Sequence, residues 1–144
     1  MIYLDTSFLA PFYIQEATSE SVEGILLTLP SQALAISNWT IVEFASLLAR
    51  RVRMGELGSE LMQAIMQSFR DDVSQSYHVF EVTAADFNLA TELILQWKSG
   101  LRAGDALHLA IAQNSQVDNF LSLDQGLIDA AQQLRIPANS GGLL

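Results

Sequence analysis

The sequence of 144 residues contains no cysteine. Disulfide scaffolds, thiolate zinc sites and cysteine nucleophiles are therefore excluded, and any metal ion must bind through oxygen or histidine. Half of the residues are hydrophobic and 16% are charged, which excludes disordered and fibrous classes of protein. Because a chain of this length buries a sizeable core, we expect one domain spanning residues 1–144.

Basic residues are few. Seven Lys and Arg stand against 16 Asp and Glu, and the formal net charge is −9. Such a charge repels nucleic acid at long range and favours basic partners or cations. Arg50, Arg51 and Arg53 nevertheless form a cluster, and Arg102 precedes another predicted helix. Two interpretations of the cluster remain open: cations that suit a helix C-terminus, or a small phosphate-binding patch.

Long hydrophobic runs are also missing. The longest apolar run, Phe8–Ile14, contains Pro11 and is far shorter than the roughly 18 residues of a membrane span. The chain opens with Ile2–Leu4 and no basic leader, which favours a first strand over a signal peptide. We therefore expect a soluble, cytoplasmic protein that does not span a membrane.

Patterns typical of strands and helices alternate along the chain. The predicted strands are Ile2–Leu4, Ala33–Ile36, His78–Val82, Asn119–Ser122 and a short fifth strand at Arg135–Pro137. The predicted helices are Thr6–Ile14, Glu20–Leu29, Asn38–Met54, Ser59–Ser74, Ala84–Trp97, Ala103–Ser115 and Gln125–Leu134. This alternation predicts an α/β fold in which helices cover both faces of a parallel sheet and ligands bind outside the carboxyl ends of the strands.

Two aspartates stand where a predicted strand ends and a helix begins. Asp5 follows Ile2–Leu4, and Asp124 follows Asn119–Ser122. Each is either a carboxylate that faces a ligand or a helix N-cap, because aspartate is among the best capping residues. The sequence leaves both interpretations open.

Two further acidic residues lie within predicted helices. Glu43 adjoins an apolar face and is interpreted as half-buried, although a solvated glutamate is the more common case. Asp105 opens a helix that is apolar nearly all round, where it either faces a ligand or complements the helix dipole. His108, one turn on, is either a ligand or, more often on such a helix, a hydrogen-bonded core residue.

Convergence of these four carboxylates would imply a cation. Ionised carboxylates in one pocket repel each other and raise each other's pKa until a cation enters. All-oxygen ligation selects hard divalent ions, Mg²⁺ or Mn²⁺, which accept phosphate oxygens as further ligands. Two such ions can activate a water and stabilise the leaving oxygen of a phosphodiester. Spacing along the chain does not show the convergence.

The order of these acidic residues resembles the PIN domain, and in particular the VapC-type toxin ribonucleases of toxin–antitoxin pairs. The segments that carry the resemblance are Asp5-Thr6-Ser7, Glu43 in the third helix, Gly104–Ala110 and Leu121–Asp124. The resemblance covers Ile2 to about Pro137. It implies a three-layer α/β/α sandwich with a short, mainly parallel central sheet.

The resemblance also implies a function and its residues. Asp5, Glu43, Asp105 and Asp124 would be the Mg²⁺ or Mn²⁺ ligands of an endoribonuclease, with Thr6 and Ser122 supporting them by hydrogen bonds. Ser122 stands where this family often has Thr. Arg50, Arg51, Arg53 and Arg102 are weaker candidates for contacts to RNA.

The resemblance further implies a cognate antitoxin that neutralises the enzyme, and a homodimer. The apolar stripe of Leu57–Phe69 serves either that dimer or, more simply, packing within the monomer. Two other functions remain open: a PIN-like interaction module without catalysis, and a PIN nuclease of RNA processing outside a toxin pair. A receiver domain is disfavoured because the only lysine is Lys98, and an aspartate-nucleophile phosphatase because the Asp-x-Asp start is missing.

Overall fold

A computed structural model describes residues 1–142, apart from the side chain of Trp97. Five parallel strands form one sheet in the order β3-β2-β1-β4-β5. The strands are β1 (Ile2–Leu4), β2 (Leu34–Ser37), β3 (His78–Phe80), β4 (Asn119–Leu121) and β5 (Ala138–Asn139). The central strand β1 thus lies between β2 and β4.

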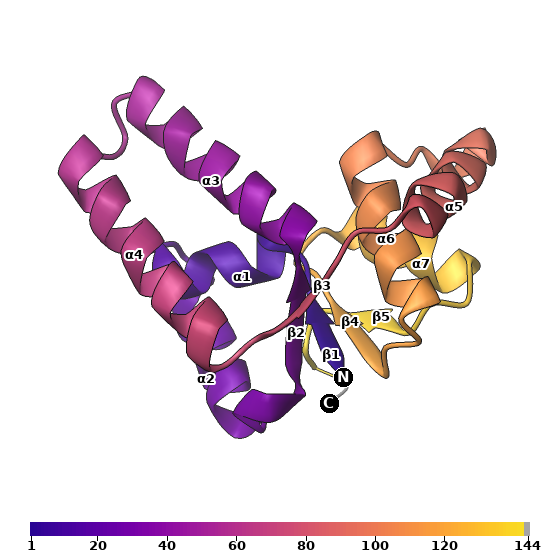
Figure 1. Ribbon diagram of the computed structural model, residues 1–144, viewed down its shortest axis with the longest axis horizontal. Coiled ribbons are helices and arrows are strands. Elements are labelled where there is room, and N and C mark those ends of the chain that lie inside the picture. Colours follow the sequence, from indigo (N-terminus) through magenta and orange to yellow (C-terminus); the bar gives the residue numbers. More distant parts are fainter. Residues whose placement is uncertain (143–144) are drawn as a thin grey trace.

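Helices cover both faces of this sheet. They are α1 (Thr6–Tyr13), α2 (Ser19–Thr28), α3 (Asn38–Arg53), α4 (Ser59–Gln75), α5 (Ala84–Leu95), α6 (Ala103–Asn114) and α7 (Gln125–Gln133), with 3-10 turns η1 (Ser31–Ala33) and η2 (Trp97–Ser99). The first four helices lie on one side of the strands and the last three on the other (Figure 1). The predicted α/β/α sandwich with a parallel sheet is therefore confirmed.

The sheet separates two hydrophobic cores. Adjacent residues of a strand point to opposite faces, and Tyr3 packs with the cluster of α5, α6 and α7 whereas Leu4 packs with that of α1 to α4. Phe120 and Leu121 of β4 divide in the same way. Most of the apolar stripe in Leu57–Phe69 packs against the second core, which confirms the interpretation of packing within the monomer.

The helix starts depend on side-chain caps that the sequence signals. Asp5 caps α1 and Asp124 caps α7, each by accepting a hydrogen bond from a backbone N–H. Ser37 with Thr40, and Thr83 with Asp86, form capping boxes at α3 and α5. The N-cap interpretation of both aspartates is therefore confirmed, and it fixes their carboxylates at the junction of strand and helix.

The fifth strand differs from its prediction at Arg135–Pro137. Residues Leu134 to Ile136 instead donate backbone hydrogen bonds to the last carbonyls of α7, and Arg135 has φ of 60°. Because these residues close the helix, pairing with β4 starts only at Pro137, whose carbonyl accepts from the Phe120 N–H at 2.7 Å, and the strand begins at Ala138. Side-chain periodicity did not reveal this closure.

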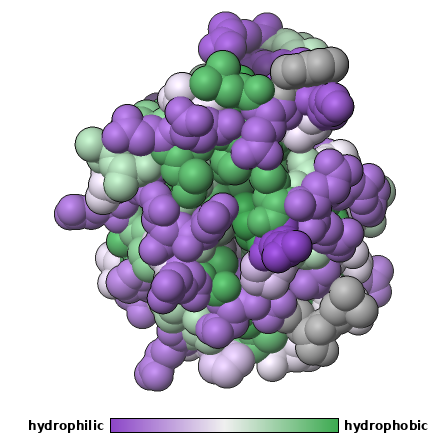
Figure 2. Space-filling view, turned by 90° about the vertical axis from the view of Figure 1, so that its right-hand side faces the viewer, coloured by the Kyte–Doolittle hydropathy of each residue, from purple (hydrophilic) through white to green (hydrophobic). Residues whose placement is uncertain are grey.

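None of the helices within residues 1–142 has the length and apolar character needed to cross a membrane. On the side of α5 to α7, hydrophobic atoms are exposed between hydrophilic ones (Figure 2). Phe87 and Leu95 of α5 are 56% and 65% exposed. This face is therefore mixed in polarity.

A tyrosine pair links α1 to the end of α4. The Tyr13 hydroxyl donates to Asp72 Oδ2 at 2.7 Å and lies 2.9 Å from the Tyr77 hydroxyl. Burial raises the pKa of Tyr77 to about 12, and burial together with Tyr77 and Asp72 raises the pKa of Tyr13. Both phenols are thus held neutral in the fold.

We expect this pair to weaken the fold in alkali. A phenol whose pKa is higher in the folded than in the unfolded chain contributes fully below pH 10, and that contribution is lost as the pH rises toward 12. For Tyr77 the loss amounts to up to about 3 kcal/mol. Urea unfolding of wild type and Tyr77→Phe at pH 7, 10 and 12 should show a smaller alkaline decline in the variant. Equal declines in the two proteins would contradict the assignment.

Candidate functional site

The carboxyl edge of β1 and β4 is where the chain order of the strands reverses. From β1, the strands β2 and β3 extend to one side, and β4 and β5 to the other. Ligands in open α/β sheets bind at such a switch point. The pairing of Leu4 with Leu121 places the next residues, Asp5 and Ser122, beside each other at this edge.

Asp5 is a buried carboxylate whose two oxygens both accept hydrogen bonds. Its side chain is 3% exposed. Oδ1 accepts from the Phe8 N–H at 2.9 Å and from the Ser7 hydroxyl at 2.8 Å, and Oδ2 accepts from the Ser122 hydroxyl at 2.6 Å. Burial nevertheless raises the pKa of Asp5, against the lowering effect of His108 and of these donors. The fold therefore holds a carboxylate where its charge is costly.

Two serines tie the start of α1 to the loop after β4. The Ser122 hydroxyl accepts from the Asp124 N–H at 3.0 Å while it donates to Asp5. The Ser7 hydroxyl likewise accepts from the Leu123 N–H at 2.9 Å. Asp5 and Asp124 are thereby connected through one shared hydroxyl group.

Glu43 approaches the same edge from α3. Its Oε1 accepts from the Thr6 hydroxyl at 2.7 Å and is bonded to His108 Nε2. Burial pushes the pKa of Glu43 upward, but the hydrogen bond and charge of His108 outweigh it, and the pKa lies below its usual value. Glu43 is thus half-buried, as predicted, and its hydrogen bonds favour the ionised form.

Gly104 permits a close approach between α6 and α3. A Cβ atom at this position would lie 3.0 Å from Glu43 Oε2 and 3.3 Å from the Trp39 ring. The Trp39 indole N–H also donates to the Gly104 carbonyl at 3.2 Å. The second oxygen of Glu43 therefore faces the first turn of α6, which carries Asp105.

Asp105 and Asp124 line one hollow of about 270 Å³ at this edge. Asp124 Oδ1 accepts from the Leu127 N–H at 3.1 Å, whereas the side-chain carboxylate of Asp105 accepts no hydrogen bond from any residue in the described part of the chain. Burial, and then the charge of Asp124, raises the pKa of Asp105, and Glu43 and Asp5 add to the rise while His108 opposes it. All four predicted carboxylates are therefore electrostatically coupled.

The donor set has the chemistry of a site for a hard divalent cation. Glu43, Asp105 and Asp124 each keep an oxygen that accepts no hydrogen bond from residues 1–142, and carboxylate oxygens are the ligands that Mg²⁺ and Mn²⁺ prefer. As they lie, no three His, Asp or Glu side chains within those residues are arranged to hold an ion. A bound ion would have to draw the carboxylates together.

The four arginines that the sequence suggested as contacts to RNA lie in two separate places. Arg102 is the residue before α6 and lines the hollow with Asp105 and Asp124. Arg50, Arg51 and Arg53 lie in the last turn of α3, which extends away from the sheet (Figure 1). Arg51 is bonded to Glu16 and lies 3.8 Å from Glu56. The helix-end position of the cluster is therefore confirmed.

Sequence reasoning missed the role of Tyr3. Its hydroxyl lies 2.7 Å from His108 Nδ1 and 2.8 Å from Ser37 Oγ, although the residue is fully buried. His108 is 1% exposed and bonded through both ring nitrogens, so the hydrogen-bonded core interpretation of it is confirmed. A tyrosine within an otherwise apolar strand was the one available signal, because a buried phenol requires a partner.

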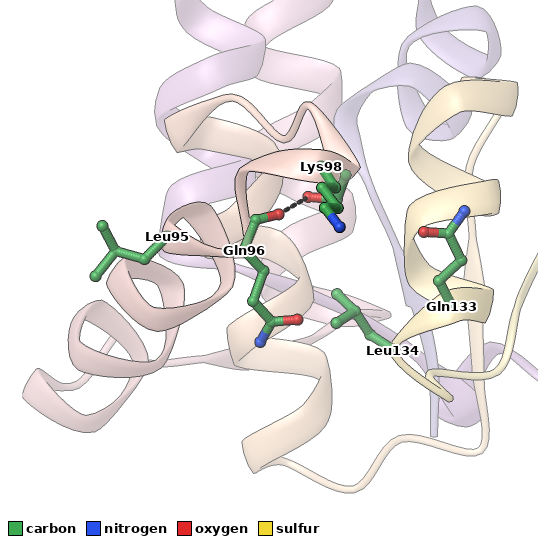
Figure 3. A pocket seen from close by; sticks show the side chains of 6 residues that line it. Leu95, Gln96, Lys98, Gln133 and Leu134 are labelled. Carbon is green, nitrogen blue, oxygen red and sulfur yellow. Dashed lines mark hydrogen bonds between the residues drawn. The ribbon is translucent and has the colours of Figure 1, made fainter.

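A second hollow lies between η2 and the end of α7. Its volume is about 380 Å³ and its lining includes Leu95, Gln96, Lys98, Gln133 and Leu134 (Figure 3). The side chains that line it include no carboxylate and no histidine. The chemistry needed for a metal site is therefore at the edge of β1 and β4 and not here.

Comparisons with known proteins agree with this architecture. The crystal structure of VapC20 from Mycobacterium tuberculosis, a sarcin–ricin-loop-cleaving toxin, has a TM-score of 0.74 and 23% identity over 90% of this chain and 95% of that chain. FitAcB from Neisseria gonorrhoeae has a TM-score of 0.79 and 16% identity over the whole of both chains. A toxin–antitoxin complex from Klebsiella pneumoniae has a TM-score of 0.59 and 16% identity over 86% and 87%. At these identities the likeness shows the fold alone.

No curated protein sequence matches the chain significantly. The model of the PIN domain family, however, matches residues 2–133. PIN domains are nucleases and generally use divalent metal ions. With this match over nearly the whole chain, and with the fold shared by the three solved structures, the chain belongs to the PIN domain family.

Proposed function

We propose that this chain is a single-domain, metal-dependent endoribonuclease and the toxin of a toxin–antitoxin pair. The observation that carries the proposal is the set of four coupled carboxylates, Asp5, Glu43, Asp105 and Asp124, at the switch point of a PIN-domain sheet. Repulsion among these carboxylates destabilises the fold when no cation is bound, and binding a cation relieves that repulsion.

The four carboxylates would hold Mg²⁺ or Mn²⁺. Bound there, the metal would supply Lewis-acid stabilisation of charge on phosphate oxygens and lower the pKa of water. Asp5 is held rigidly by its three donors, whereas Asp105 has no such donor among residues 1–142. We assign the principal ion to Asp5 and Asp105, with Glu43 and Asp124 completing the site.

Supporting residues orient these ligands. Thr6 donates to Glu43 at 2.7 Å and Ser122 donates to Asp5 at 2.6 Å. Ser122 stands where the PIN family often has threonine, and it keeps the hydroxyl group that donates to Asp5. Removal of such outer hydrogen bonds typically lowers metal affinity or activity 10-fold to 100-fold.

Arg102 is our first candidate for a contact to an RNA phosphate, because it lines the hollow beside Asp105. Arg50 and Arg53 are exposed at the end of α3, about 10 Å and about 15 Å along the helix from Glu43. They would contact the RNA backbone several nucleotides from the cleaved bond. Arg51 is committed to Glu16 and Glu56 and contributes least.

A cognate antitoxin is the partner we propose, and the cytoplasm the location. One structure of the same fold is a toxin–antitoxin complex, and another is a toxin that cleaves the sarcin–ricin loop. The sheet edge that carries Asp5, Glu43, Asp105 and Asp124 is called the acidic edge below. It would attract an arginine-bearing segment of an antitoxin, because guanidinium groups pair with carboxylates in two parallel hydrogen bonds. A homodimer also belongs to this proposal.

Replacing Asp105 with asparagine should separate activity from stability. Asp105→Asn removes one ligand, so we expect metal-dependent cleavage of a mixed cellular RNA pool to be lost. The fold raises the pKa of Asp105, so its ionised form costs stability at pH 7, and the variant should unfold at an equal or higher urea concentration. Asp71→Asn, on the exposed surface of α4, is the matched control and should cleave normally. A well-folded, fully active Asp105→Asn protein would contradict the site.

Metal should stabilise the folded chain. An ion that binds only the folded state adds RT ln(1 + [L]/Kd), or about 2.7 kcal/mol at 100 times its Kd. We expect the melting temperature to rise with Mn²⁺, to return to its starting value with EDTA, and to be unaffected by Mn²⁺ in Asp105→Asn. The same rise in wild type and variant would show that the ion binds elsewhere.

A methyl group at Gly104 should disturb the site without removing a ligand. The added Cβ in Gly104→Ala would meet Glu43 Oε2 and the Trp39 ring, so we expect weaker Mn²⁺ binding and slower cleavage. Gly24→Ala is the matched control, since nothing lies within 4 Å of its Cβ and it should gain about 0.5–1 kcal/mol in stability. Equal Mn²⁺ affinities in the two variants would disprove the close approach.

A further inference from the structure

A chain of hydrogen bonds runs beneath the acidic edge and ends at Glu43. It begins at Ser37, whose hydroxyl caps α3 and lies 2.8 Å from the hydroxyl of Tyr3. Tyr3 lies 2.7 Å from His108 Nδ1, and His108 Nε2 is bonded to Glu43. Three segments that are distant in sequence, namely β1, the junction of β2 with α3, and α6, therefore meet in one polar chain between apolar surroundings.

Packing fixes the first part of this chain. The Tyr3 ring is stacked between Phe80 of β3, at 6.4 Å, and Phe120 of β4, at 5.4 Å, measured between ring centroids. The His108 ring meets it edge-on at 5.7 Å. Neither ring can turn without displacing the core, so the phenol and the imidazole nitrogens have defined positions.

The donors and acceptors determine which nitrogen of His108 carries a proton. An ionised carboxylate only accepts hydrogen bonds, so His108 Nε2 must donate to Glu43. The Tyr3 hydroxyl lies between Nδ1 and Ser37 and can donate to one while it accepts from the other, so it satisfies Nδ1 whether or not that nitrogen also carries a proton. Every polar group of the chain is thereby satisfied with Nε2 protonated.

The result is a carboxylate whose two oxygens have different tasks. Oε1 of Glu43 is occupied by His108 and by Thr6. Oε2 faces Gly104 and the start of α6, the helix of Asp105. Because both ring nitrogens of His108 are engaged, the imidazole itself has no lone pair left for a metal ion.

We propose that His108 is a positioning residue: held by Tyr3 with Nε2 protonated, it fixes Oε1 of Glu43 and so directs Oε2 toward the metal. This inference rests on the proposed function for the identity of the bound ion. The hydrogen-bond chain itself is a property of the metal-free protein and is tested separately.

The first experiment reads the ring nitrogens in metal-free protein. The chain has two histidines, and the second, His78, is exposed on β3. In a His78→Gln variant, ¹⁵N-labelled histidine gives signals from His108 alone. Two-bond ¹H–¹⁵N correlations should show a protonated Nε2, and Tyr3→Phe should shift the Nδ1 signal. A ring protonated only at Nδ1 would overturn the proposal, even if the wild-type protein also cleaves RNA.

The second experiment compares two replacements of His108 by Mn²⁺ titration calorimetry. His108→Leu fills the space of the ring with an apolar side chain that cannot donate a hydrogen bond. This variant should weaken Mn²⁺ binding at least 10-fold. His108→Gln places an amide N–H near the position of Nε2 and should restore most of that loss. His78→Gln is the matched control and should bind as wild type does.

The outcomes separate a positioning role from a merely structural one. A role in packing alone predicts that leucine and glutamine variants with native circular dichroism bind Mn²⁺ equally well, and that result would overturn the proposal. Wild-type protein that binds no Mn²⁺ would contradict the proposed function and the metal-directed part of this inference. The ring-nitrogen spectra would still decide whether His108 holds Glu43.

Discussion

The acidic edge depends on one constraint, which is that the fold must provide hydrogen bonds for the carboxyl group of Asp5 at the buried end of its central strand. A buried charge requires hydrogen bonds on every side, and Asp5 receives them from the first turn of α1 and from Ser122 after β4. The same bonds join the two strand ends on which the site is built. The hydrogen bonds that stabilise this edge therefore also fix the position of the Asp5 carboxylate.

Electrostatics divides the four carboxylates into two kinds. Asp5 and Glu43 are held by donors from several elements, whereas Asp105 and Asp124 face one hollow, where the charge of Asp124 raises the pKa of Asp105. Asp5, Glu43 and the capping oxygen of Asp124 are thus held in place, whereas the carboxylate of Asp105 accepts no hydrogen bond from residues 1–142 and can adjust to a ligand. A metal cation and an arginine side chain both relieve this repulsion, so the two would compete for the same negative potential.

The two faces of the sheet serve different purposes. Toward α1 to α4 the core is formed by apolar side chains such as Leu4, Phe8 and Phe44. Toward α5 to α7 the core contains Tyr3 and His108, which carry a polar connection through it. Buried polar groups are tolerated there because each has a partner, and no buried side-chain nitrogen or oxygen in the described part of the chain lacks one.

The sequence alone determined the alternation of strands and helices and the buried character of α6, because both follow from local periodicity. It also supplied the four acidic residues, through their order in a family pattern. It misplaced the fifth strand, since the closure of α7 depends on the backbone conformation at Arg135. Only the tertiary structure decided that these carboxylates share one edge and that Tyr3 and His108 support Glu43, because residues more than 30 positions apart meet only when the strands pair and the helices pack.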